Sequence, residues 1–499
     1  MNQTQTEQYL KSTLAALNAL RYEAAGKVTD IRWCGYDYGQ DPAPQADAGA
    51  WPLFHADETW GGSDLHFCFD AVVSAPEQAV GKKLVLRLNT GATDIWNTDN
   101  PQIFVYLNGS LCAAMDMNHH ELTLSEAAGA GETYAVRFYA YSNYSQKTNF
   151  FHLTLHTVDP IAQKAYYDFK VPLEAALLLR DDDERKALLY NILMQTALRM
   201  ELQNGCTDRG ESLASACAFL SEALERHRGE SVCEVYSIGH THIDVAWKWP
   251  LRQTREKAAR SFQTVLSLMK AYPEYLFMSS QPQLYQFVKE DRPELYAQIK
   301  ERVREGRWET EGAMWLEADC NLSSGESLIR HILHGKRFFR EEFGCEDNVV
   351  LWLPDVFGYS AALPQIMQKT GLRYFMTTKI GWNDTNQFPY DTLYWEGIDG
   401  SRVLSHFITT RNYVPYPELC RSHNSSTTYN GLENASQIMG TWQRYQNKSV
   451  SRKVLTCYGY GDGGGGTTTE MIEEGRRLQK GILNLPKVRF PKCATFLKT

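Results

Sequence analysis

The spacing of hydrophobic residues changes several times along this chain. The leucines at positions 10, 14, 17 and 20 follow helical spacing, which predicts a short amphipathic helix over residues 5–25, within an N-terminal segment of residues 1–30. Residues 31–159 instead contain short β-rich segments, such as LHFCFDAVV, KKLVLRLNT and TYAVRFYAYS, divided by Gly, Asn and Asp turns. This pattern predicts a β-sandwich. Residues 160–231 return to a helical pattern with one polar face, which indicates a helical connector.

From residue 232 to residue 499, apolar strands alternate with helices. The segments CEVYSIG, NVVLWLP and VLTCYGYG read as buried strands, whereas TREKAARSFQTVLSLMKAY and ESLIRHILHGKRFFREEFG read as helices. This alternation predicts a parallel sheet, either open or closed into a barrel. The predicted fold class is therefore α/β, with a β-sandwich and a helical linker in front of the α/β part.

Composition narrows the choice of partners and compartment. The chain has 499 residues and a net charge of −8, so no basic surface points to nucleic acid or to an anionic membrane. Its 11 cysteines contain no C-x-x-C pair, which argues against a zinc ribbon or a disulfide framework. We find neither a signal-peptide core nor an apolar stretch of about 20 residues, and we expect a cytoplasmic protein that does not span a membrane.

The segment SIGHTHIDVAWKWP places His240, His242 and Asp244 at every second position after an apolar run. If the strand continues through them, all three side chains point to one face. They would then lie at the carboxyl end of the strand, where α/β folds place their active sites. Imidazole and carboxylate are ligands that Zn²⁺ accepts. The alternative is a strand end whose histidines are only hydrogen-bonded.

Two further strands end in an aspartate. Asp355 follows NVVLWLP directly, and Asp462 follows VLTCYGYG and precedes four glycines. Structural alternatives exist for both, since Asp355 suits a helix N-cap and Asp462 suits a turn. The loop WLEADCN also presents Glu317 and Asp319, for which a solvated loop face is an equal alternative. The glycine run lacks the lysine and hydroxyl of a phosphate-binding loop.

Together these residues are typical of a carbohydrate hydrolase. Glycoside hydrolysis requires paired carboxylates, one to attack and the other to protonate the leaving oxygen. Aromatic rings also suit the C–H face of a sugar. The tryptophans that accompany the predicted site are Trp247, Trp249, Trp315, Trp382 and Trp395.

The motifs GHTHIDVAWKWP, WETEGAMWLEADCN, LWLPDVFGYSAALPQI and YGYGDGGGG resemble those of glycoside hydrolase family 38, the α-mannosidases. They are most similar to the cytosolic and bacterial branch and occur in the family's order. The resemblance implies a seven-stranded α/β barrel that holds one Zn²⁺, with Co²⁺ as an alternative. It also implies retaining hydrolysis of terminal non-reducing α-D-mannosyl residues of oligosaccharides.

The resemblance assigns metal ligands and a nucleophile. His242 and Asp244 match metal ligands of the family, and Asp355 matches the nucleophile, which also touches the metal. On this alignment His240 is a neighbour of the metal site rather than a ligand.

Three further residues receive roles from the same resemblance, and Trp315 receives one from its aromatic ring. Asp462 is the candidate acid/base, although better-known members carry two adjacent aspartates at this strand end and this chain has Asp462 followed by glycine. Trp247 matches the ring that stacks under mannose, and Trp315 is a second candidate substrate-binding ring. Lys379 stands where a basic residue near the nucleophile is expected.

One ligand of the family pattern is missing. The family takes its fourth zinc ligand from a later His-Asp segment, whereas the last histidine of this chain is His423. We therefore expect an N-terminal fragment or a truncated reading frame of a longer protein, with an incomplete barrel. Such a chain alone is expected to be a poor catalyst.

Two other functions remain open at this point. In a metal-dependent polysaccharide deacetylase, a metal-activated water attacks an acetyl group, and release of acetate rather than mannose would identify it. An inactive carbohydrate-binding protein would have no need of a nucleophile, and the presence of Asp355 argues against it.

Overall fold

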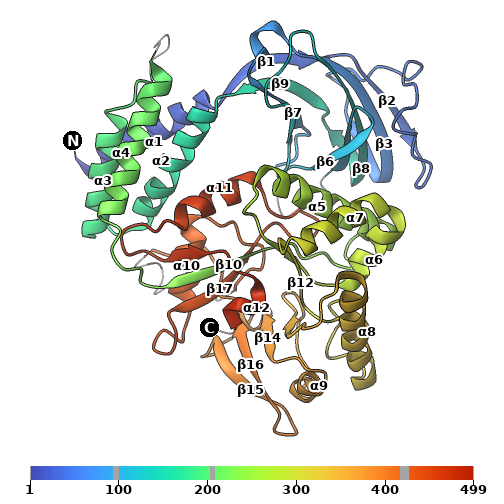
Figure 1. Cartoon of the computed structure of the whole chain (residues 1–499), viewed down its shortest axis with the longest axis vertical. Coiled ribbons are helices and arrows are strands. Elements are labelled where there is room, and N and C mark those ends of the chain that lie inside the picture. The colour runs from blue at the N-terminus through green and yellow to red at the C-terminus, as the bar shows by residue number, and fades with distance from the viewer. Residues whose placement is uncertain are drawn as a thin grey trace.

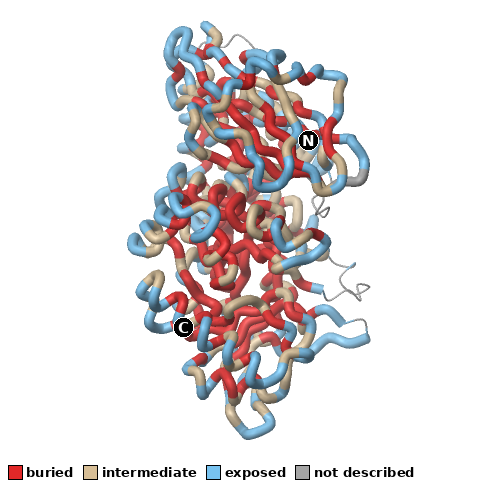
Figure 2. The backbone as a smooth tube through the Cα atoms, turned by 90° about the vertical axis from the view of Figure 1, so that its right-hand side faces the viewer, coloured by how far each residue is buried: buried red, intermediate tan, exposed pale blue. Residues whose placement is uncertain are grey.

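The computed structural model describes residues 2–93, 101–202, 208–383, 385–415, 418 and 426–497. His423, named above, lies outside the described residues. Figure 1 shows two antiparallel sheets at the top, a group of helices beside them, and a mixed α/β part below. Figure 2 shows buried segments running through the centres of the upper and the lower part.

The N-terminal helix is shorter than expected. Helix α1 (Gln3–Leu20) starts with a capping box between Asn2 and Gln5 and buries Leu10 and Leu17 completely. After α1 the chain forms strand β1 (Tyr22–Val28), which pairs antiparallel with β9 (His152–Val158). The prediction of a helix that continues to residue 25 was therefore wrong, because pairing with β9 overrides the local preference of the alanines in YEAAGKV.

Two antiparallel sheets form the β-sandwich, in the orders β1-β9-β4-β7 and β2-β3-β8-β5-β6. Apolar side chains from both sheets share one core, in which the rings of Phe69 and Phe151 stack 3.8 Å apart. The remaining elements are β2 (Ile31–Tyr36), β3 (Trp60–Ser74), η1 (Glu77–Ala79), β4 (Lys83–Asn89), β5 (Gln102–Leu107), β6 (Ser110–Met115), β7 (Glu121–Ser125), β8 (Thr133–Asn149) and β9 (His152–Val158).

Helices connect the sandwich to the α/β part. Asp159 caps the first of them and Pro160 occupies its first turn, a favourable start for a helix. Their apolar faces share a core with α1 and with Val235, Ile438 and Val454 of the α/β part. The helices are α2 (Pro160–Leu178), α3 (Glu184–Ala197) and α4 (Arg209–Arg226).

The α/β part contains two sheets. One has the order β12-β11-β10-β17, all parallel, with β18 also paired to β10; the other has the order β13-β14-β16-β15, with only β15 antiparallel to its neighbour. The strands are β10 (Glu234–His240), β11 (Phe277–Ser279), β12 (Trp308–Thr310), β13 (Val350–Trp352), β14 (Tyr374–Thr377), β15 (Thr392–Glu396), β16 (Arg402–Phe407), β17 (Lys453–Tyr458) and β18 (Lys487–Arg489). The helices are α5 (Leu251–Ala271), α6 (Pro282–Asp291), α7 (Pro293–Arg304), α8 (Gly325–Phe343), α9 (Leu363–Lys369), η2 (Lys379–Gly381), α10 (Ala435–Arg444), α11 (Thr469–Leu478) and α12 (Cys493–Leu497). The predicted α/β class is thus confirmed.

Within the described residues, strand hydrogen bonds do not close one barrel. Between β12 and β13, Glu311 Oε1 accepts from the backbone N–H groups of Val349 and Val350, at 3.2 Å each. Between β16 and β17, the backbone N–H of Leu455 donates to His406 Nε2 at 3.2 Å. Burial lowers the pKa of His406 to about 3, so the ring is neutral and can accept. The resemblance implied a seven-stranded barrel, here expected to be incomplete; at these two seams side chains rather than strand pairing satisfy the backbone donors.

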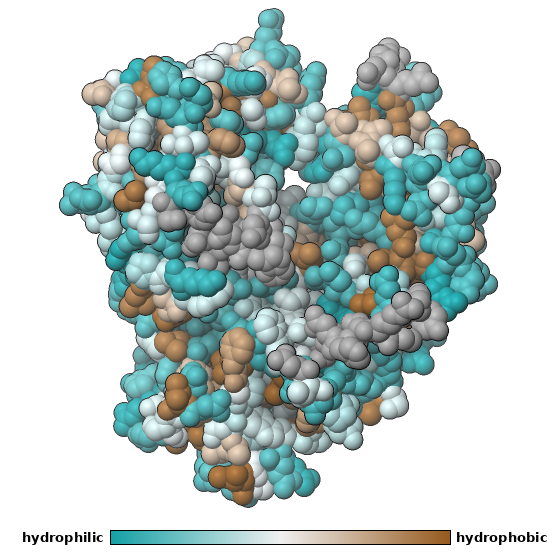
Figure 3. Space-filling model, turned by 180° about the vertical axis from the view of Figure 1, so that it is seen from behind, coloured by the Kyte–Doolittle hydropathy of each residue, from teal (hydrophilic) through white to brown (hydrophobic). Residues whose placement is uncertain are grey.

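Seen from behind, the sandwich and the helical connector form two lobes at the top, separated by a notch (Figure 3). Apolar residues are scattered over this face. No helix among the described residues is long and apolar enough to cross a membrane.

Candidate active site

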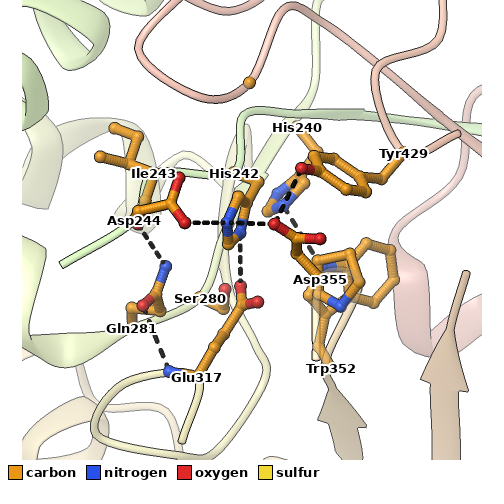
Figure 4. A network of polar contacts seen from close by, with 12 residues as sticks. His240, His242, Ile243, Asp244, Ser280, Gln281, Glu317, Trp352, Asp355 and Tyr429 are labelled. Carbon is orange, nitrogen blue, oxygen red and sulfur yellow. Dashed lines mark hydrogen bonds and ion pairs between the residues drawn. The ribbon is translucent and has the colours of Figure 1, made fainter. Parts of the chain in front are cut away.

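Four side chains gather beyond the carboxyl ends of three parallel strands. His242 and Asp244 follow β10, Asp355 follows β13 and Asp462 follows β17. Each offers one ligand atom, and these atoms all lie within 4.8 Å of one another. Figure 4 shows the first three converging, with His242 and Asp244 on one loop and Asp355 on another. Three separate strand ends therefore supply one cluster, as α/β folds commonly arrange.

The H-x-H-x-D segment does not converge in the way its alternation suggested. Strand β10 ends at His240, so His242 and Asp244 lie on the loop that follows. His240 is buried, with Nδ1 3.0 Å from the carbonyl of Met278, and its Nε2 accepts from Trp352 Nε1 at 3.3 Å. Burial lowers the pKa of His240 to about 3, so the ring is neutral. His240 therefore supports the core beneath the site.

The ring of His242 is held by a carboxylate on one side and faces two on the other. Its Nδ1 lies 3.1 Å from Glu317 Oε1. An ionised carboxylate only accepts, so Nδ1 donates to Glu317; when the ring is neutral, this leaves the lone pair of Nε2 free for a metal ion. Among the described residues, Nε2 is buried without a hydrogen-bond partner, 3.6 Å from Asp244 Oδ1 and 3.5 Å from Asp355 Oδ2. A carboxylate behind a ligating histidine is a common arrangement at metal sites.

The negative charge of this buried cluster favours binding of a cation. Burial lowers the pKa of His242, but the charges of Glu317 and Asp244 outweigh it and hold the pKa well above its ordinary value. Burial raises the pKa of Glu317; His242 opposes this effect, and the like charges of Asp355 and Asp244 add to it. A divalent metal ion satisfies the same need as a proton on His242, and one imidazole nitrogen with carboxylate oxygens is a donor set that zinc accepts. The residues present thus fit a metal ion.

Lys379 lies beside the candidate nucleophile. Its Nζ is 2.7 Å from Asp355 Oδ1 and 3.5 Å from the centre of the Trp382 ring, and the residue is buried. The ammonium group stabilises the negative charge of Asp355. The structure therefore brings this residue to the place that the sequence analysis expected.

Tyr429 joins the two candidate catalytic carboxylates. Its hydroxyl lies 3.0 Å from Asp355 Oδ2 and 2.8 Å from Asp462 Oδ1, and Asn430 Nδ2 donates to Asp462 Oδ2 at 3.1 Å. Burial raises the pKa of Asp462, which the charge of His242 only partly opposes. The sequence analysis missed both Tyr429 and Asn430, which lie in the polar segment SSTTYNG without helical or strand periodicity.

The two predicted substrate-binding tryptophans differ in their surroundings. Trp247 is 42% exposed on the loop after Asp244, with its ring 6.1 Å from that of Trp249. Trp315 donates to Gln283 Oε1 at 3.0 Å and meets the Phe338 ring edge-on at 5.6 Å. The ring of Trp247 is thus available to a ligand, whereas Trp315 is held between α6 and α8.

The two acidic residues of the WLEADCN loop also differ. Glu317 belongs to the site through His242, and its backbone N–H donates to Gln281 Oε1 at 3.2 Å. Asp319 Oδ1 accepts from the backbone N–H groups of Asn321 and Leu322 and shapes the turn instead.

The chain is also similar to a known protein family and to known relatives. Residues 232–499 match the model described as glycosyl hydrolases family 38 N-terminal domain. Alpha-mannosidase G of Dictyostelium discoideum is 41% identical over 304 residues, which cover 60% of this chain and 26% of that protein. Alpha-mannosidase 2C1 of Homo sapiens is 40% identical over 282 residues, covering 56% of this chain and 25% of that protein.

A solved alpha-mannosidase structure from Enterococcus faecalis is 20% identical, with a TM-score of 0.43, over 53% of this chain and 29% of that chain. The chain spans about a quarter of the length of the two curated relatives, at 26% and 25%. Because the family model matches more than half of its residues, the chain belongs to glycosyl hydrolase family 38.

Proposed function

We propose that this chain supplies the catalytic part of a retaining, metal-assisted α-mannosidase that removes terminal non-reducing α-D-mannosyl residues from oligosaccharides. The observation that carries the proposal is the cluster of His242, Asp244, Asp355 and Asp462. The relatives named as alpha-mannosidases support the substrate class.

His242, Asp244 and Asp355 would hold the metal ion, with Zn²⁺ or Co²⁺ as the expected species. The unpartnered Nε2 of His242 and the nearby oxygens of the two aspartates support this assignment. When bound, such an ion supplies a Lewis acid that fixes sugar hydroxyls and stabilises developing charge.

Asp355 would act as the nucleophile. Its carboxylate attacks the anomeric carbon, and the bond to the leaving oxygen breaks as the glycosyl-enzyme ester forms. The Lys379 ammonium at 2.7 Å and the Tyr429 hydroxyl at 3.0 Å orient the carboxylate. Trp247, exposed on the adjoining loop, would stack against the mannose ring, and a similar role for Trp315 stays a prediction.

Asp462 would be the acid and then the base. A raised pKa keeps its proton available for the leaving oxygen, and the ionised form then takes a proton from the water that hydrolyses the ester. The contributing oxygens of Asp355 and Asp462 lie within 4.8 Å of each other. Retaining enzymes hold their two carboxyl groups about 5–5.5 Å apart and inverting enzymes about 6.5–9.5 Å, so the short separation favours retention.

We also infer that residues 232–499 are the catalytic domain, whose strands correspond to the family's barrel. Residues 31–159, joined by β1 (Tyr22–Val28), would be a separate β-sandwich domain, and residues 160–231 a helical connector. A cytoplasmic location is supported by the nine cysteines of the described part, which are all free.

The test follows the stereochemistry of one turnover. The protein at its natural full length is incubated with an aryl α-mannoside, and NMR records the first anomer released. We expect α-mannose, together with labelling of Asp355 by a mechanism-based fluoromannoside. Release of β-mannose, or a label on another residue, would contradict the assignment. Release of acetate from an acetylated polysaccharide without mannoside cleavage would favour the deacetylase.

A further inference from the structure

The β-sandwich grips the glycine-rich loop that follows Asp462. Gln102 Nε2 donates to the carbonyl of Gly463 at 3.2 Å, and Asn118 Nδ2 donates to the carbonyl of Gly464 at 3.0 Å. His119 Nε2 lies 2.9 Å from the carbonyl of Thr467. Three polar side chains from β5 and the turn between β6 and β7 therefore bind three carbonyls of one loop.

The orientation of the Gln102 amide is fixed from within the α/β part. Arg260 of α5 donates from Nη2 to Gln102 Oε1 at 2.7 Å, and Arg260 Nη1 is paired with Glu256 Oε2 at 2.9 Å. Because a guanidinium only donates, the oxygen of Gln102 must face Arg260 and its NH₂ must face Gly463. Gln102 is 5% exposed and Arg260 is 4% exposed. This chain of hydrogen bonds is buried and has a single direction.

His119 faces an acceptor at each ring nitrogen. Its Nδ1 is 3.0 Å from Asp116 Oδ1, and Nε2 meets the Thr467 carbonyl. Burial lowers the pKa of His119, but Asp116 outweighs it and raises the pKa above the ordinary value. With both nitrogens donating, the ring is locked between the sandwich and the loop.

The glycines permit this close approach. Gly463 and Gly465 have φ values of +87° and +85°, which favour glycine over other residues. A Cβ on Gly465 would lie 2.2 Å from Asp116 Oδ2 and 2.8 Å from His119 Nδ1. The glycine run therefore allows the turn between β6 and β7 to pack closely against the backbone next to Asp462.

The same loop is held from the other side by the site itself. The backbone N–H of Asp462 donates to the carbonyl of His242 at 2.8 Å, and that of Gly461 donates to Asn430 Oδ1 at 2.9 Å. Asp462 has a φ of +56°, a conformation that a non-glycine residue holds only when its surroundings enforce it. The sandwich completes this enforcement on the far side of the loop.

We propose that Gln102, Asn118 and His119 of the β-sandwich are positioning residues for Asp462, and that the sandwich thereby forms part of the catalytic unit. The inference rests on the proposed function, in which Asp462 is the acid. Without the three contacts the loop is no longer held on the sandwich side, and the carboxyl group can leave its place beside Asp355. A misplacement of about 1 Å costs on the order of 10²-fold in rate.

The test compares His119→Leu with His119→Gln in the full-length protein. Leucine removes the donor to Thr467, whereas glutamine can restore it with its own NH₂. His152→Leu is the matched control, since His152 is a sandwich histidine that contacts Ala56 within the sandwich. Two readouts are taken: hydrolysis of methyl and 2,4-dinitrophenyl α-mannosides, and hydrogen exchange of the backbone amides of residues 461–467.

For His119→Leu we expect a roughly 10–100-fold loss of kcat/KM on the methyl mannoside, a much smaller loss on the dinitrophenyl mannoside and faster exchange in residues 461–467. His119→Gln should recover part of both changes, and His152→Leu should match the wild type. Equal losses on both substrates, or unchanged exchange in residues 461–467, would overturn the proposal.

The two readouts separate this proposal from the proposed function. If the wild type cleaves no α-mannoside, the proposed function fails, and the exchange measurement alone decides whether the sandwich holds the loop. If His119→Leu does not fold, Asn118→Ala removes the contact with Gly464 instead and is judged on the same two readouts, with the same expected pattern at smaller amplitude.

Discussion

The two strand ends that carry Asp355 and Asp462 are supported in different ways. The loop of Asp355 is held by residues close to it in sequence: Thr378 Oγ1 donates to the carbonyl of Pro354 at 2.6 Å, and Tyr359 donates to the carbonyl of Val356 at 2.6 Å. The loop of Asp462 is held by side chains of the β-sandwich that lie 346–361 residues earlier in the chain.

This difference separates two tasks within one site. Under the proposed function, attack and metal binding depend mainly on contacts inside the α/β part, so we expect them to respond less to changes in the sandwich. Proton donation would depend on a loop that contacts both parts of the molecule. The loss of activity should therefore depend on the leaving group for variants of Asp462 and its loop, but not for variants of Asp355.

The largest effect is expected from Asp355→Ala. Without the carboxylate no glycosyl-enzyme forms, and kcat should fall by at least about 10³-fold on every aryl α-mannoside, whatever its leaving group. Steady-state kinetics on a series of phenols measures this. The control is Asp319→Ala, which removes an acidic residue that only shapes a turn. Substantial turnover by Asp355→Ala would show that another residue is the nucleophile.

Asp462→Ala should show the opposite dependence. Loss of the proton donor should cost about 10²–10⁴-fold on a methyl mannoside and far less on a dinitrophenyl mannoside, because an acidic phenol leaves without protonation. Azide should accelerate turnover of the activated substrate, since it replaces the water that Asp462 would deprotonate. If the losses are equal on both substrates and azide has no effect, Asp462 is not the acid.

The sequence predicted the strand ends better than the contacts between them. Apolar runs identified β10, β13 and β17, and the residues directly after them delivered Asp355 and Asp462 to the site. Tyr429 could not be found in this way, because a polar loop has no period that reports where its side chains point.

The same limit applies to the two seams of the α/β part. A single buried side chain, Glu311 or His406, replaces a run of backbone pairing there, and a lone residue leaves no pattern along the chain. The contacts between the sandwich and the Asp462 loop could not be predicted either, because Gln102 and His119 lie in a region whose sequence indicates only β-structure. Long-range polar contacts must be seen in three dimensions.

Glu317→Gln should weaken metal binding without changing proton donation by Asp462. An amide cannot match the charge-assisted bond to His242 Nδ1, and such outer partners typically contribute 10–100-fold to metal affinity. Zinc binding to the metal-free protein, measured by calorimetry, should weaken within that range, with no change in leaving-group dependence. Asp319→Asn on the same loop is the control. Unchanged zinc affinity would show that Glu317 does not contribute to metal binding.

The smallest effect concerns the seam between β12 and β13. Burial raises the pKa of Glu311 from 4.5 to about 8, with Glu309 adding like charge. The folded protein therefore keeps a proton on Glu311 that the unfolded chain releases above pH 4.5. The free energy of unfolding should decline as pH rises from about 4.5 to about 8, and this contribution should level off at higher pH.

Glu311→Gln keeps an oxygen for the N–H groups of Val349 and Val350 but carries no titratable proton. Urea unfolding at pH 6 and pH 9 measures how far the free energy of unfolding falls between these two values. We expect this fall to be smaller in the variant than in the wild type by at least about 1.4 kcal/mol, the equivalent of one pKa unit. Lys336, the positive charge that faces Glu311, is unchanged in both proteins. Glu326→Gln, on the exposed start of α8, should behave like the wild type. Equal declines in Glu311→Gln and wild type would mean that Glu311 is already ionised at neutral pH, and that the seam is held by charge rather than by a neutral carboxyl group.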